Sequence, residues 1–181
     1  MLKNMPKFYD VHREKFPEKY AKWESFFRKA PGRIKKLKIF GKLSTGAVYI
    51  AYVLLTAYVI LSDISLLLRT VIVPGAIFTV TTLVRKGINA PRPYEYSDSP
   101  ITPLVPKSTG GNSCPSRHTA CAFAIALAAL YVNIPAGIVL TILAALIGIS
   151  RPIMGVHYPF DVAFGAAIAL VIGIIGFWII P

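Results

Sequence analysis

Five long apolar runs make up most of this chain, and short polar segments separate them. The runs cover residues 46–62, 64–84, 119–132, 134–149 and 162–180. The last has 19 residues without a charge, close to the ~20 that cross a bilayer as a helix. The third and fourth runs are shorter and reach that length only if flanking polar residues are helical too. Backbone groups in lipid must be hydrogen-bonded internally, and a membrane barrel would show alternating hydrophobicity. The pattern therefore predicts an all-α, polytopic membrane bundle with about five transmembrane helices.

The composition supports lipid rather than water as the surroundings of these helices. Hydrophobic residues make up 55% of the chain and charged residues only 15%, whereas charged residues are roughly 25% of ordinary soluble domains. One apolar run of this length would also fit the core of a soluble helical domain. Five of them leave too little polar surface for a water-soluble shell, which disfavours the soluble interpretation.

The positive charge is concentrated at the N-terminus. Thirteen of the 20 Lys and Arg residues lie in residues 1–42, with aromatic residues interleaved, and the net charge of the chain is +12. Such a segment is typical of a helix that lies on a lipid bilayer with anionic headgroups. Nucleic-acid binding is the rival explanation, but no nucleic-acid-binding signature accompanies the charge. We predict a basic amphipathic interfacial segment over residues 1–43, broken at Pro31-Gly32, and a membrane domain over residues 44–181.

The remaining polar chemistry falls into three short strings at the ends of apolar runs. The strings are Arg85-Lys86 with Arg92-Pro93, Pro115-Ser116-Arg117-His118, and Ser150-Arg151 with His157 and Asp161. If the chain crosses the membrane five times, all three strings lie on the same side as the N-terminus. A random scatter of Arg and His would not give this arrangement, so the strings predict a single site at one end of the bundle.

The residue types in these strings suit the cleavage of a phosphate ester. The non-bridging oxygens of a phosphate can be held by four cations, Arg85, Lys86, Arg92 and Arg151. His118 and His157 can divide the tasks of proton donor and nucleophile. Asp161 lies one helical turn after His157, where its carboxylate can orient the imidazole. Cations near lipid are costly without a counter-charge, and a phosphate would supply that charge.

Two prolines indicate where the helices that carry these residues begin. Pro115 suits the first turn of a helix, so that the backbone N–H groups from Ser116 onward would face an anion at the positive end of the helix. Pro159 marks a second helix start, which places Asp161 in the first turn of that helix.

In these three strings the chain resembles the type 2 phosphatidic acid phosphatases, an integral-membrane lipid phosphatase family often called PAP2. The family signature is a basic residue, six others and Arg-Pro; then Pro-Ser-Gly-His; then Ser-Arg, five others, His, three others and Asp. The third part is matched completely. The second part has Arg117 where Gly is usual. The first part has Arg85 where Lys is usual. Lys86 has the usual charge but lies one residue too close to Arg92-Pro93 to fit the signature. The resemblance covers residues from about 46 to 180.

The resemblance implies a phosphatase that hydrolyses a lipid phosphate or diphosphate without a metal or another cofactor. Phosphatidic acid, phosphatidylglycerophosphate and a polyprenyl diphosphate all remain open as substrates. His157 would form a phosphohistidine, Asp161 would bond to its other ring nitrogen, and His118 would protonate the leaving group. The phosphate would be bound by Arg85 or Lys86, Arg92, Arg151, Ser116 and the backbone or side chain of Arg117.

Two other functions fit the same pocket. A vanadate-dependent haloperoxidase uses related chemistry, but such enzymes resemble larger soluble proteins. A lipid-phosphate binding or transport protein would keep the pocket without turnover. The presence of both histidines and of Asp161 favours the phosphatase.

The distribution of charge also predicts the side of the membrane. With five spans, 19 of the 20 Lys and Arg residues fall on the N-terminal side, and Arg69 is the exception. The positive-inside rule then places the basic segment over residues 1–43 and the site at the cytoplasmic face of the plasma membrane. A further span within residues 17–27 or 33–43 would reverse this assignment, but neither stretch has a long apolar run.

Overall fold

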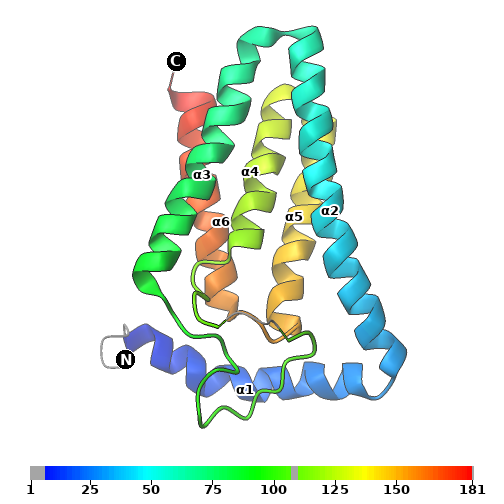
Figure 1. The fold of residues 1–181 in the computed structure, drawn as a ribbon, viewed down its shortest axis with the longest axis vertical. Helices are drawn as coiled ribbons and strands as arrows, with labels where there is room; N and C mark the ends of the chain where they lie inside the picture. Colours follow the sequence, from blue (N-terminus) through cyan, green and yellow to red (C-terminus); the bar gives the residue numbers. More distant parts are fainter. Residues whose placement is uncertain (1–6, 107–109, 181) are drawn as a thin grey trace.

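The computed structural model describes residues 7–106 and 110–180, apart from the side chains of residues 7–13 and 31. Five helices run up and down as a bundle, and a sixth crosses one end of it (Figure 1). The helices are α1 Lys7–Arg28, α2 Pro31–Ser62, α3 Leu67–Ile88, α4 Arg117–Val132, α5 Ile134–Ile153 and α6 Pro159–Ile174. A 3-10 turn, Ile64–Leu66, joins α2 to α3, and a π-helical turn, Ile175–Ile179, extends α6.

The five helices of the bundle correspond to the five apolar runs. Within the described ranges, four helical segments are long and apolar enough to cross a membrane: Gly32–Ser62, Ile64–Ile88, Ile134–Ile153 and Pro159–Ile179. The helix α5 reaches its length as expected, because it continues past the apolar run through Ser150 and Arg151. The helix α4 has only 16 residues. The all-helical membrane fold is thereby confirmed, and the interfacial role of residues 1–43 stays a prediction.

The helix α4 occupies the centre of the bundle (Figure 1). Its buried side chains are mostly small, among them Ala120, Ala124, Ala126, Ala128 and Ala129. Small residues let helix backbones approach closely. In lipid the hydrophobic effect does not drive helices together, so they associate through this close packing. Large apolar side chains instead point outward from the surrounding helices, as at Leu54 and Leu61, which are 65% and 88% exposed. Because α4 is enclosed by other helices, it is less constrained by the thickness of the lipid than they are.

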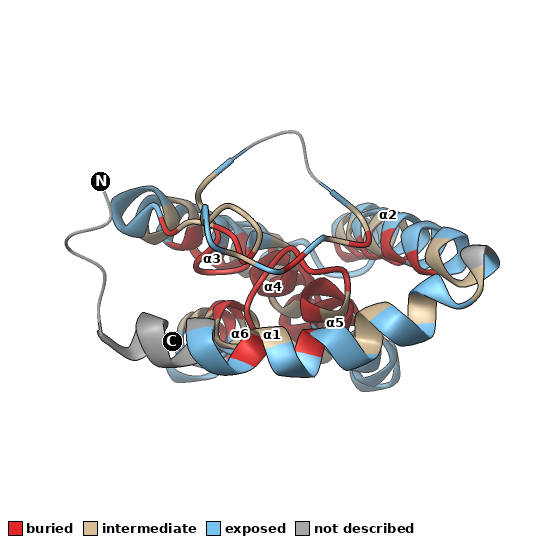
Figure 2. Cartoon of the chain, turned by 90° about the horizontal axis from the view of Figure 1, so that it is seen from below, coloured by how far each residue is buried: buried red, intermediate tan, exposed pale blue. Residues whose placement is uncertain are grey.

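The helix α1 lies across the base of the bundle, beneath α6 and α5 (Figures 1 and 2). Phe16 and Tyr20 are buried there. The ring of Phe16 meets that of Tyr158 edge-on, with centroids 5.2 Å apart. The Tyr20 hydroxyl donates to the Thr102 carbonyl oxygen at 2.9 Å and accepts from the Leu104 N–H at 3.1 Å. The helix α1 is thus attached to the α3–α4 loop and to the α5–α6 turn.

The segments that carry the three strings meet at this same end. The long loop from α3 to α4 and the short turn from α5 to α6 both lie at the end that α1 crosses (Figure 1). The Leu104 N–H also donates to the Met154 carbonyl oxygen at 3.1 Å, which joins the loop directly to the turn. Arg69 begins α3 at the opposite end, where it bonds to the Tyr131 hydroxyl.

Candidate active site

The turn between α5 and α6 holds His157 and Asp161 in contact. Pro159 begins α6 and Asp161 lies in its first turn, as the sequence predicts. One carboxylate oxygen of Asp161, Oδ2, accepts from the Tyr158 N–H at 2.9 Å and lies 3.4 Å from His157 Nδ1. A third residue, Ser113, donates its hydroxyl to the same oxygen at 2.6 Å. Ser113, His157 and Asp161 are all fully buried.

This network determines which nitrogen of His157 carries the proton. Ser113 Oγ lies 3.3 Å from His157 Nδ1. Because the Ser113 O–H is directed at the carboxylate, the lone pairs of its oxygen are left to face Nδ1. Both neighbours of Nδ1 are therefore acceptors, which assigns the proton to Nδ1 and leaves Nε2 with a free lone pair.

The charge state of His157 agrees with this assignment. Burial lowers the pKa of His157 to about 4, although the hydrogen bond and charge of Asp161 act to raise it. The imidazole is therefore neutral at pH 7. Its Nε2 atom is buried and has no hydrogen-bond partner within the described part of the chain. A neutral imidazole with a bare Nε2 is in the form required of a nucleophile.

Arg92 is bonded to Val156, the residue before this imidazole. The residue is 2% exposed, and Nη1 donates to the carbonyl oxygen of Val156 at 3.0 Å. Its Nε atom is buried with no hydrogen-bond partner among the described residues, and Glu95 Oε1 lies 3.8 Å from it. A buried, unsatisfied donor is unusual in proteins and costs about 1–3 kcal/mol. An anion bound next to His157 would satisfy it.

The acidic residue Glu95 organises the loop that carries Arg92. Its two carboxylate oxygens accept from the Gly111 N–H at 3.0 and 2.9 Å, and Oε2 also accepts from the Arg92 N–H at 2.8 Å. Gly111 has φ of +64°, a left-handed conformation that glycine adopts at little cost. Glu95 thus joins the two ends of the α3–α4 loop.

Four of the predicted phosphate-binding residues share one cavity of about 230 Å³ at the end of α3, which we call the α3 cavity. Its walls are Thr82, Arg85, Lys86, Arg92, Gly110, Gly111, Asn112 and Arg117. Arg85 is half-buried and donates from Nη1 to the Pro115 carbonyl oxygen at 3.0 Å. Lys86 and Arg117 are exposed at the mouth.

The start of α4 differs from the sequence prediction. Pro115 precedes the helix, and Ser116 is the N-cap with extended backbone angles, so the prediction that Pro115 lies in the first turn was wrong. The reason is that the Ser116 N–H is held by the Asp161 carbonyl oxygen at 2.8 Å, so helical geometry begins only after Ser116 and not at the expected cap, Ser113 or Cys114. This contact needs Gly165 in α6, because a Cβ there would lie 2.6 Å from the Ser116 carbonyl oxygen.

His118 and Arg151 lie on the side of the site that faces α2. Arg151 is 5% exposed and donates from Nη2 to Thr45 Oγ1 at 2.9 Å, while its Nε atom is buried without a hydrogen-bond partner in the described residues. His118 is half-buried and lines a narrow gap with Thr45 and Tyr49 of α2. The predicted residues thus form two groups, and the first turn of α4 joins them.

Three residues in this arrangement are not part of the sequence prediction of the site. Ser113 and Glu95 lie near the motifs, but nothing in their spacing indicates that one reaches Asp161 and the other Gly111. Thr45 lies in α2, 106 positions from Arg151, and carries no sequence signal. Among the described residues, no group of three or more His, Cys, Asp or Glu side chains could hold a metal ion.

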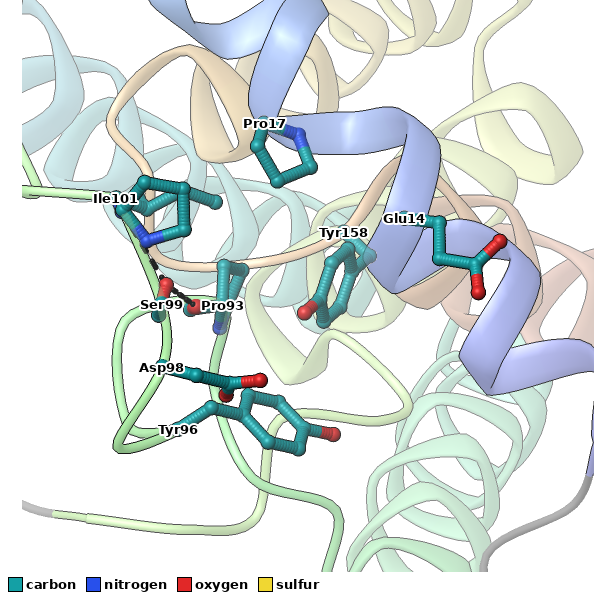
Figure 3. A pocket seen from close by; sticks show the side chains of 9 residues that line it. Glu14, Pro17, Pro93, Tyr96, Asp98, Ser99, Ile101 and Tyr158 are labelled. Atoms are coloured by element: carbon teal, nitrogen blue, oxygen red, sulfur yellow. Dashed lines mark hydrogen bonds between the residues drawn. The ribbon is translucent and has the colours of Figure 1, made fainter.

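A larger cavity, of about 550 Å³, opens beside the site between α1 and the α3–α4 loop. Figure 3 shows Tyr158 and Pro93 in its wall together with Glu14 of α1. Tyr158 and Pro93 are the chain neighbours of His157 and Arg92, so this cavity approaches the site from the base of the bundle.

A helical membrane bundle carries two histidines, an aspartate and several arginines at one end. The chain belongs to the PAP2 superfamily, which it matches over residues 46–181. This match confirms the family resemblance drawn from the three strings.

Two curated relatives match part of the chain. It is 38% identical over 87 residues to undecaprenyl-diphosphatase BcrC of Bacillus subtilis (strain 168), covering 48% of this chain and 44% of that protein. It is 40% identical over 70 residues to the bacitracin transport permease protein BcrC of Bacillus licheniformis, covering 39% of this chain and 34% of that protein. The aligned parts are therefore less than half of the length of either relative.

Two solved structures share the fold over most of their length. Aquifex aeolicus LpxE superposes with a TM-score of 0.66 at 26% sequence identity, covering 84% of this chain and 92% of LpxE. A PAP2-type phosphatidylglycerolphosphate phosphatase from Bacillus subtilis superposes with a TM-score of 0.64 at 22% sequence identity, covering 87% of this chain and 81% of that protein. The second likeness shows the fold alone.

Proposed function

We propose that this protein is a membrane phosphatase that hydrolyses a lipid phosphate or diphosphate through a phosphohistidine at His157. One observation carries the proposal: His157 is neutral and fully buried, with Nε2 bare, and buried Nε atoms of Arg92 and Arg151 lack hydrogen-bond partners in the described residues. A nucleophile surrounded by unsatisfied cationic donors suits an anionic electrophile, and phosphorus in a phosphate ester is such a centre.

The reaction proceeds in two steps on the chain's own residues. Nε2 of His157 attacks phosphorus, the bond between phosphorus and the leaving oxygen breaks, and His118 gives its proton to that oxygen. His118 then takes a proton from water, whose oxygen attacks the phosphohistidine and releases phosphate. Asp161 stabilises the positive charge that His157 acquires. The phosphate oxygens are held by Arg85, Arg92, Arg151, Ser116 and the N–H groups at the start of α4.

The surroundings of the site support a lipid substrate. The outward faces of the bundle carry large exposed apolar side chains, so a substrate with an acyl or prenyl chain can remain in the bilayer while its phosphate reaches the base of the helices. The relative named as an undecaprenyl-diphosphatase fits this class. Phosphatidic acid, phosphatidylglycerophosphate and polyprenyl diphosphates are the substrates to compare.

The purified protein is expected to release phosphate from phosphatidic acid or a polyprenyl diphosphate in detergent with excess chelator. The reason is that the donors above already neutralise the phosphate, so no divalent ion is required. Vanadate should inhibit the release, and His157→Ala prepared in parallel is the control. Loss of activity in chelator that divalent ions restore would contradict the metal-independent mechanism. A folded protein that binds vanadate and releases no phosphate would instead be a lipid-phosphate binder.

We also propose that the site faces the cytoplasm in the plasma membrane, because the basic residues of α1 and the start of α2 lie at the end that carries the site. In a background without Cys114 and Cys121, Ser97→Cys should resist a membrane-impermeant thiol reagent on intact cells. Ser62→Cys, exposed at the opposite end, is the matched control and should react. Ready labelling at position 97 with protection at position 62 would reverse the assignment.

A further inference from the structure

The α3 cavity holds more positive charge than one phosphate requires. Four of its eight wall residues are cations, and none is an acid. Glu95 is not among the wall residues; its carboxylate accepts from the N–H groups of Arg92 and Gly111, and its Oε1 lies 3.8 Å from Arg92 Nε, so it offsets one of the four cations. A phosphate monoester carries a charge of about −2 at most at neutral pH. Arg92 and Arg85, with Arg151 on the other side, already match that charge.

The cavity also contains hydrogen-bonding atoms without partners. Arg92 Nε is buried, its side chain is 3% exposed, and it has no hydrogen-bond partner in the described residues. The hydroxyl oxygen of Thr82, one helical turn before Lys86, is buried and equally without a partner there. Buried polar groups are rarely left unsatisfied. The two residues that carry these atoms line the same cavity, which suits a polar ligand there.

Arg117 directs a further charge toward this cavity. Its guanidinium carbon lies 5.7 Å from the centre of the Phe78 ring, so the side chain leans on α3. The family signature has Gly at this position, and the backbone N–H alone satisfies that pattern. The arginine is therefore a property of this chain that binding of a single phosphate does not explain.

We propose that Arg117 and Lys86, with the Thr82 hydroxyl, form a subsite for the second phosphate of a lipid diphosphate. This rests on the proposed function. His118, which protonates the leaving oxygen, follows Arg117 in the first turn of α4, so the α3 cavity and the leaving-group side meet at that turn. Nε2 of His157 bonds to the terminal phosphorus, and the bond from that phosphorus to the bridging oxygen breaks. The electron pair leaves with the lipid monophosphate, whose charge Arg117 and Lys86 stabilise.

The test compares a polyprenyl diphosphate with the corresponding polyprenyl monophosphate. We expect Arg117→Gly to lower the ratio of kcat/KM for diphosphate over monophosphate by roughly 10- to 100-fold, the usual effect of losing a hydrogen bond to a charged group. Lys86→Ala should lower the same ratio. Lys38→Ala removes an exposed charge of α2 outside the cavity and controls for general attraction of anions. A ratio within about twofold of wild type in both cavity variants would overturn the subsite.

Binding of inorganic ions separates a failure of the subsite from a failure of the proposed function. Titration of the purified protein with pyrophosphate and with phosphate should show that Arg117→Gly weakens pyrophosphate more than phosphate. If the wild-type protein releases phosphate from neither lipid, the proposed function fails. A selective loss of pyrophosphate binding in Arg117→Gly would still support the subsite. Equal weakening of both ions, or no weakening of pyrophosphate, would overturn it.

Discussion

Replacing His157 with alanine is expected to lower turnover by more than about 10⁴-fold, as removal of a nucleophile does in other covalent enzymes. The variant should also form no covalent phosphoenzyme. No other described side chain presents a buried, neutral imidazole with a bare Nε2. The measurement is an alkaline quench after mixing with a lipid labelled in its terminal phosphate. Label that stays on the protein in His157→Ala would mean that another residue is the nucleophile.

The pH dependence of this step follows from the low pKa. A histidine whose pKa is lowered to about 4 stays deprotonated while the solution passes below 6.5, the ordinary value. Phosphoenzyme formation in the wild-type protein should therefore persist at pH 5.5 in a single-turnover quench. Protonation of Nε2 stops the attack only as the pH approaches the folded-state pKa. Loss of labelling centred at pH 6.5 would show that the imidazole is not shielded by burial.

His118→Ala is expected to slow hydrolysis of an unactivated lipid phosphate by roughly 10²–10⁴-fold, the range for general acid–base catalysis. An aryl phosphate with a good leaving group needs little protonation, so its first step should be affected much less. The second step still requires a base, and phosphoenzyme should accumulate in a burst. The measurement is the burst amplitude with each substrate, compared with His157→Ala. Near-wild-type turnover in both variants would mean that the site is misassigned.

Features set by neighbouring residues were predictable from the sequence. The helix start at Pro159 and the place of Asp161 in the first turn depend only on local backbone preferences. The five apolar helices likewise follow from hydropathy, because lipid imposes helical structure on each run separately. The three strings indicate one site because an even number of membrane crossings separates each string from the N-terminus, which brings all three to one end.

Contacts between distant segments were not predictable in the same way. The Ser113 hydroxyl meets Asp161, 48 positions away, only because α6 packs against the start of α4. That packing moves the start of α4 past Pro115, contrary to the local signal. Thr45 reaches Arg151 across the bundle from a helix with no motif of its own. Each contact is a product of helix packing, which periodicity and propensity do not encode.

The helix α1 makes the geometry of the active-site turn depend on a segment outside the family match, which begins at residue 46. Phe16 packs against Tyr158, the residue after His157, and the Tyr20 hydroxyl is hydrogen-bonded to Thr102 and Leu104 of the α3–α4 loop. The bundle therefore carries the candidate reactive groups, while α1 contacts the turn and the loop that hold them. We expect substitutions in α1 to alter turnover at the proposed site with the transmembrane helices unchanged.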